Sequence, residues 1–143
     1  MVFKPKQRAK VVANVFPQFK LGNNTLQYVK QFKYLGHVIT EDLTDDAVIQ
    51  REIRNLFTRT NILLQQFHRC SVAVKCTLFR AYCICLYDAA LWSRYNAGLL
   101  RRLNSCYNKC VKLFFGFKRS DSVTNMLFER GLPCFNTITD NAQ

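Results

Sequence analysis

Acidic residues are scarce in this chain of 143 residues, and none occurs among the first forty. The whole sequence holds nine Asp and Glu against 21 Lys and Arg, which gives a formal net charge of +12. Such a surplus raises the local concentration of anions and favours nucleic-acid phosphates or anionic lipid as a partner. The alternatives are a solvated basic surface, or the basic part of a complex that is neutral overall.

Long apolar runs are also missing, and the N-terminal residues do not have the pattern of a secretory leader. The longest apolar stretch, around residues 81–92, is interrupted by Asp88 and is too short for a transmembrane helix. The N-terminus carries charges before any apolar run, so we expect no signal peptide. The seven cysteines are odd in number and lie mostly in apolar helical stretches, where free thiols act as small hydrophobes. We therefore expect reduced thiols in an intracellular protein of the nucleus or cytoplasm, with no membrane partner.

Residue patterns for catalysis are weak. No Gly-rich phosphate loop is present, and His68 and Cys70 are spaced so that they diverge on a helix. One acidic cluster could hold hard cations, but its place before a predicted helix favours capping; it comprises Glu41, Asp42, Asp45 and Asp46. We expect no catalytic residue in this chain.

A zinc site is the weakest alternative. It needs four Cys or His ligands, usually in close pairs. Cys106 and Cys110 are one helical turn apart and Cys83 is close to Cys85, but neither pair has a neighbouring histidine. Structural thiols are therefore favoured, and we expect no metal ligand and no cofactor.

The N-terminal part of the sequence predicts extended structure. Residues 10–16 are rich in β-branched side chains, and residues 19–28 predict a short hairpin over a Gly-Asn turn. Residues 32–40 predict a second extended run, in which Gly36 indicates a bulge or a close backbone approach.

Helical periodicity begins after the acidic cluster. The first helix is expected over 46–68, capped by Thr44 or Asp45. A second, opened by Ser71, is expected to reach residue 95 and to carry one apolar side formed by Val74, Leu78, Ala81, Tyr82, Cys85 and Ala89. A third spans 99–114 and ends at Gly116, and a short acid-capped one spans 121–130. The tail after residue 135 is expected to fray. The fold class is thus α+β, mainly α: a short β element, then three to four bundled helices.

Basic residues alternate with aromatic ones at Phe32-Lys33-Tyr34, which suits contacts with phosphates, sugars and bases. On the first predicted helix, Arg51, Arg54 and Arg59 could face a phosphate backbone. For each residue taken alone, an exposed charge or a core aromatic is the more ordinary explanation.

Residues 29–40, with their Phe-Lys-Tyr-Leu-Gly core, resemble the primer-grip segment of reverse transcriptases of non-LTR (LINE-type) retrotransposons. Several further segments resemble the same family in the same order, at residues 1–3, 19–22, 26–29, 45–68, 87–92 and 120–128. In that family a hairpin follows the catalytic palm and holds the primer 3′ end. A helical thumb comes next and grips the template–primer duplex.

The resemblance implies roles for particular residues. Primer contact would fall to Phe32, Lys33, Tyr34, Leu35 and Gly36, and contact with the nucleic-acid backbone to Lys30, Arg51, Arg54 and Arg59. It also implies three regions: the end of the palm with the primer grip (1–43), the helical thumb (44–116), and a short post-thumb helix with the tail (117–143). The implied partners are an RNA/DNA template–primer duplex and the family's palm and fingers.

One departure from the family affects function. The Phe/Tyr-Ala-Asp-Asp turn that carries catalytic aspartates in the family's palm does not occur in this sequence. We therefore expect a C-terminal fragment of an RNA-directed DNA polymerase that is not an enzyme by itself, whereas its parent would use Mg²⁺. The alternative is a non-catalytic helical module for protein interaction or nucleic-acid binding.

Overall fold

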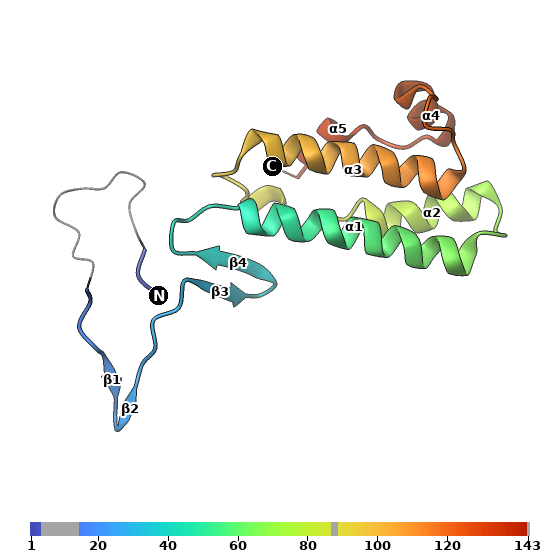
Figure 1. The fold of residues 1–143 in the computed structure, drawn as a ribbon. Coiled ribbons are helices and arrows are strands. Elements are labelled where there is room, and N and C mark those ends of the chain that lie inside the picture. The colour runs from blue at the N-terminus through green and yellow to red at the C-terminus, as the bar shows by residue number, and fades with distance from the viewer. Residues whose placement is uncertain (4–14, 87–88, 143) are drawn as a thin grey trace.

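The computed structural model describes residues 1–3, 15–86 and 89–142, so most of the extended segment predicted over 10–16 lies outside the described residues. Within the described parts, two small antiparallel hairpins come first and five α-helices follow (Figure 1). The fold is α+β and mainly α, as the sequence predicts.

The first hairpin confirms the prediction for residues 19–28. Strand β1 (Lys20–Leu21) pairs antiparallel with β2 (Asn24–Thr25), and Gly22 at the turn has a φ of 60°. Left-handed φ values of this kind are what tight two-residue hairpin turns require. Each strand has only two residues. Figure 1 shows this hairpin projecting away from the helices.

The second hairpin corrects the prediction of one extended run over 32–40. Strand β3 (Gln31–Tyr34) reverses into β4 (His37–Thr40), with Tyr34 opposite His37. The reversal lies at Leu35 and Gly36, whose φ angles are 47° and 89°. Two consecutive positive φ values are typical of a type I′ turn, so Gly36 serves the turn and forms no bulge.

Helix α1 (Asp46–Phe67) confirms the first predicted helix. Asp45 stands at its N-cap but makes no capping hydrogen bond, contrary to prediction. Its carboxylate instead accepts the backbone N–H groups of Ser93 and Arg94, each at 2.9 Å. Asp46 accepts the N–H of Asn96 at 2.7 Å. These bonds place the start of α1 beside the start of α3 (Ala97–Phe115), and the two helices run parallel (Figure 1).

Helix α2 (Val72–Cys83) begins at Ser71 as predicted, but it ends well before residue 95. A 3₁₀ turn, η1 (Ala89–Leu91), follows it. The predicted apolar side is only partly covered, because Leu78 packs against the core whereas Val74 and Tyr82 are 46% and 57% exposed. The buried side chains of α2 are those of Cys76, Phe79 and Cys83. Both sides of this helix are apolar, so periodicity alone could not choose between them.

The C-terminal helices cover one side of the bundle. Helix α3 ends at Gly116, in the left-handed region with φ of 75°, as predicted. Helix α4 (Val123–Arg130) begins after Ser122, not at residue 121. The expected frayed tail is instead helix α5 (Phe135–Asp140). Buried Phe135 anchors it, with its ring centroid 6.2 Å from that of Tyr107.

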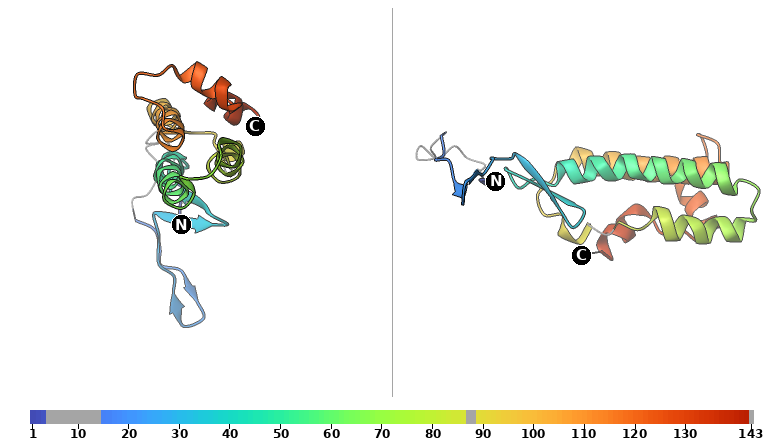
Figure 2. Two further views of the ribbon diagram at one scale, coloured as in Figure 1. Left: turned by 90° about the vertical axis from the view of Figure 1, so that its right-hand side faces the viewer. Right: turned by 90° about the horizontal axis from the view of Figure 1, so that it is seen from below.

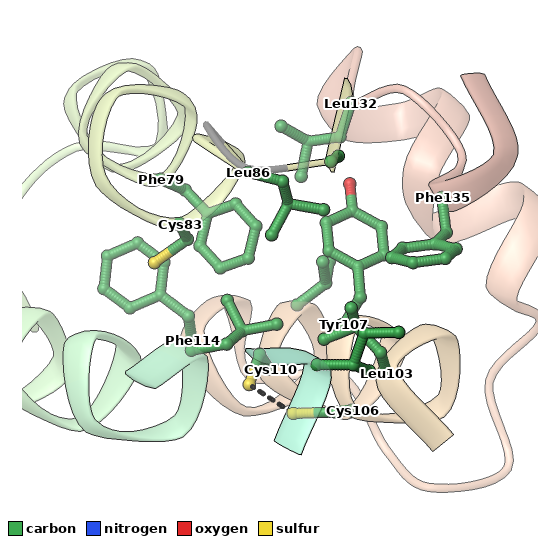
Figure 3. Close-up of a cluster of buried hydrophobic side chains, with 14 of the residues drawn as sticks. Phe79, Cys83, Leu86, Leu103, Cys106, Tyr107, Cys110, Phe114, Leu132 and Phe135 are labelled. Atoms are coloured by element: carbon green, nitrogen blue, oxygen red, sulfur yellow. Dashed lines mark hydrogen bonds between the residues drawn. The ribbon is translucent and has the colours of Figure 1, made fainter. Parts of the chain in front are cut away.

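The main core lies among the helices and is rich in aromatic rings. Figure 2 shows α1, α2 and α3 end-on as three corners of a bundle, with α4 beyond α3. Phe79 of α2 stacks on Phe114 of α3 at 5.8 Å between centroids, and Tyr107 lies next to Phe79 (Figure 3). The Tyr107 hydroxyl donates to the Pro133 carbonyl at 2.7 Å. The bundle is therefore a well-packed support for the second hairpin.

Candidate nucleic-acid interface

The β3–β4 hairpin presents its predicted primer-contact residues to solvent. All four residues of β3 are exposed, whereas all four of β4 are half-buried, so β4 is the strand next to α1. Val38 of β4 packs against the helical core. Phe32 and Tyr34 are 52% and 58% exposed, and Lys33 lies between them. Two aromatic rings and an ammonium group are thus available on one outer strand.

Leu35 and Gly36 form the tip of this hairpin. The Leu35 side chain is 88% exposed, so little of its apolar surface is buried. A Cβ added at Gly36 would meet nothing within 4 Å. The glycine is therefore needed for its positive φ, and no described atom crowds the position that a side chain would take.

The predicted arginines of α1 fall into two groups. Arg51 donates through Nη1 to the Gly36 carbonyl and lies 3.4 Å from the Glu52 carboxylate. Arg59 lies 3.4 Å from the other Glu52 oxygen and reaches the Tyr82 carbonyl of α2 at 3.4 Å. These two guanidinium groups hold the fold together, which leaves fewer of their donors for a ligand.

Arg54 and Lys30 remain at the surface. Arg54 is exposed on α1, one turn beyond Arg51. Lys30 is exposed immediately before β3, and its carbonyl accepts the N–H of Glu41 at 2.9 Å, which extends the hairpin ladder by one pair. The structure therefore joins Arg51 to the predicted primer-contact segment and places Lys30 at the foot of the same hairpin.

Helix α3 carries a basic surface that the predictions missed. Arg101, Arg102 and Lys109 are exposed, and residues 97–115 contain no acid. The thiol of Cys106 donates to the Ile53 carbonyl of α1 at 3.6 Å, so the row formed by Arg102, Cys106 and Lys109 flanks α1. Arg54 projects from the neighbouring helix. The sequence signal that could have revealed this basic surface is the absence of acidic residues over the five turns of α3.

The acidic cluster makes contacts within the chain. Two of its members, Asp45 and Asp46, bind backbone amides, and Asp45 also lies 3.6 Å from Nε2 of His37. Hydrogen bonds from the Thr40 and Thr44 hydroxyls lower the pKa of exposed Asp42. Among the described residues no group of three or more His, Cys, Asp or Glu side chains could hold a metal ion. These carboxylates organise the junction between hairpin and helices.

The cysteines are free thiols, several of them in the core. Burial raises the pKa of Cys83 to about 11. The sulfur atoms of Cys106 and Cys110 lie 4.0 Å apart, and the hydrogen bond between these thiols together with burial raises the pKa of Cys106. Buried neutral thiols are poor nucleophiles. This geometry suits packing better than catalysis.

A shallow cavity of about 260 Å³ lies between the segment after α2 and helix α5. Its lining is Ile84, Leu86, Pro133, Ile138, Asn141 and Ala142, with Asn141 the single polar side chain. It offers no acid, base or nucleophile for a reaction. None of the described helices has the length and apolar character needed to cross a bilayer.

No protein-family model matches the chain, and no curated protein or solved structure matches it. The functional argument therefore depends on the residue pattern and on the geometry described above.

Proposed function

We propose that this chain is the primer-grip and thumb part of a reverse transcriptase of the non-LTR retrotransposon type, and that it binds an RNA–DNA template–primer duplex. The observation that carries the proposal is the 32–36 segment. It forms an exposed hairpin whose turn is hydrogen-bonded by Arg51 to the first of three bundled helices. A hairpin with this core, followed directly by a helical thumb, is the order that the resemblance implies.

The proposed role is binding without chemistry. Exposed Phe32 and Tyr34 suit contacts with sugars and bases, and Lys33 suits a phosphate. The catalytic aspartates with their Mg²⁺ would belong to a part of the palm that has no counterpart in this sequence, and that part with the fingers would be the protein partner. Such a polymerase part would act in the nucleus or cytoplasm, where RNA templates occur.

The basic face of the helices extends this interface. Arg54 on α1 and the row of Arg102 and Lys109 on α3 lie along two parallel helices, and α3 has no acid to repel phosphates. Phosphate contacts of this kind position a duplex without reading its sequence. The proposal therefore predicts binding that depends on salt and tolerates any sequence.

A salt titration of the full chain with a fluorescent RNA–DNA hybrid tests the proposal. The logarithm of affinity should fall linearly with the logarithm of salt concentration between about 50 and 200 mM. Lys33→Ala should lower the affinity and reduce that slope by about one. Lys118→Ala is a matched control because Lys118 is exposed in the loop after α3, and it should bind like the unsubstituted chain. Absence of binding at low salt, or binding insensitive to salt, would count against the proposal.

A second candidate function is a helical protein-interaction module. The observation in its favour is the outward side of α2, where Val74 and Tyr82 of the predicted apolar side are exposed. Exposed apolar stripes often mark interaction surfaces. Analytical sedimentation over a concentration series discriminates between the two candidate functions. Oligomers that dissociate when Val74 is replaced by Asp would favour the interaction module. A monomer that melts cooperatively argues against it.

A further inference from the structure

An aromatic cluster beside the first hairpin stands apart from the helical core. Phe16, Phe19 and Tyr28 meet there, with the ring centroid of Tyr28 at 6.0 Å from Phe16 and 6.4 Å from Phe19. The Tyr28 hydroxyl donates to the Pro17 carbonyl, which fixes the orientation of its ring. Phe19 and Tyr28 are nevertheless 58% and 43% exposed. The rings are ordered by one another and still open to solvent.

The surroundings of this cluster are basic. Lys20 lies in β1 next to Phe19, and Lys30 follows Tyr28 by two positions. No acidic residue precedes Glu41 in the sequence. From Tyr28 the chain continues through Lys30 directly into β3, so the cluster adjoins the hairpin of the proposed primer grip.

We propose that Phe19 and Tyr28 form a stacking platform for single-stranded nucleic acid, with Lys20 and Lys30 contacting its phosphates. The two rings lie outside the hairpin to which the proposed function assigns the duplex, whereas Lys30 lies at the foot of that hairpin. The proposal rests on the proposed function only in placing the platform next to a hairpin that binds a duplex.

Charge and ring geometry favour this occupant. A base inside a duplex has both faces covered by its neighbours, so an exposed ring stacks more readily on an unpaired base. Lysines with no acid among them match a polyanion better than an ordinary protein surface. Stacking accepts every base because each has a π face, so the platform would be indifferent to sequence.

The test measures binding of the full chain to three labelled probes: an oligo(dT) strand, an abasic strand of equal length, and an RNA–DNA hybrid. Phe19→Ala and Tyr28→Ala should each weaken oligo(dT) binding at least about fivefold. Both variants should leave the hybrid affinity unchanged, and the abasic strand should bind weakly to every variant. Phe128→Ala is the matched control, because Phe128 is 88% exposed on α4, away from the cluster.

A second variant separates stacking from loss of folding. Phe19→Trp keeps a stacking ring, so it should retain oligo(dT) affinity, and its indole fluorescence should be quenched when the strand binds. The native Trp92 is only 6% exposed and gives a constant background. Circular dichroism of each variant checks that the helices are intact.

The possible failures are distinguishable. Binding of the hybrid without binding of oligo(dT) would overturn the platform and leave the proposed function standing. If the chain binds neither probe, the platform and the proposed function are both wrong. Equal binding of the abasic strand would mean phosphate contact alone and would also overturn it. If the alanine variants turn an oligomer into a monomer without changing oligo(dT) affinity, the cluster is a protein contact and the proposal is wrong.

Discussion

Arg51 of α1 donates a hydrogen bond from its guanidinium group to the carbonyl oxygen of Gly36, at the turn between β3 and β4. The same guanidinium lies 3.4 Å from Glu52, whose other carboxylate oxygen is 3.4 Å from Arg59. Glu52 is only 8% exposed, and a carboxylate so little hydrated needs partners of opposite charge. A charged network that begins inside the bundle therefore fixes the tip of the exposed hairpin.

Replacing Arg51 should loosen this attachment. Arg51→Ala removes the bond to Gly36 and one partner of Glu52, so the free energy of unfolding should fall by about 1–3 kcal/mol. Urea denaturation followed by circular dichroism measures this change, and hydrogen exchange should speed up in β3 and β4. Arg54→Ala is the control, since Arg54 is exposed, and it should change stability by less than about 0.5 kcal/mol. Equal effects of the two substitutions would contradict the network.

The buried thiol of Cys83 should make stability depend on alkaline pH. Burial raises its pKa from 9.0 to about 11, so the folded chain keeps a proton that the unfolded chain releases. The stability that this thiol contributes is complete below pH 9.0 and is lost as the pH rises to about 11. Unfolding free energies measured by urea over that range should fall with pH.

Cys83→Ala should make this fall less steep. The part that remains is expected from Tyr107 and Cys106, whose pKa values are also raised in the folded chain. Cys134→Ala is the control, because the Thr137 hydroxyl lowers the pKa of that exposed thiol. If Cys83→Ala and the unsubstituted chain lose stability at the same rate, Cys83 is hydrated in solution.

The long helices were predictable because several local signals agree in them. In α1 the apolar period and the acids before its first turn agree, and in α3 the broad stripe ends at a glycine with the required positive φ. Periodicity could not give the end of α2, since the apolar residues continue past Cys83 without a glycine or proline. The α5 helix was missed because only two apolar side chains, those of Phe135 and Ile138, anchor an otherwise polar segment to the core.

The sequence drew attention to β3 and less to the other parts of the candidate site. The aromatic and basic residues 32–34 are adjacent in sequence, but only the structure shows that Phe32 and Tyr34 are exposed and do not lie in the core. That Arg51 binds the turn depends on how the hairpin packs on α1, which no local pattern records. The alignment of Arg102 and Lys109 with α1 likewise depends on the contact of Cys106 with Ile53.

The α3 surface should contribute to binding of the RNA–DNA hybrid. The double variant Arg102→Glu and Lys109→Glu should lower hybrid affinity by more than about tenfold and reduce the salt slope by about two, since two phosphate contacts are lost. The pair Lys118→Glu and Arg119→Glu makes the same change in net charge in the exposed loop after α3. Fluorescence anisotropy compares the two. Equal losses would mean that net charge, and not this surface, governs binding.

A substitution at Leu35 should change the stability of the chain and its affinity for the hybrid in opposite directions. Its φ of 47° is unfavourable for a branched side chain. Because the side chain is 88% exposed, its burial does not offset this backbone strain. Leu35→Asn creates the Asn-Gly pair that type I′ turns favour and should stabilise the chain by about 0.5–1 kcal/mol in urea denaturation. If Leu35 contacts the primer, the same variant should bind the hybrid less tightly although its hairpin is better ordered. Higher stability with unchanged affinity would remove Leu35 from the interface, and lower stability would show that the turn has another shape in solution.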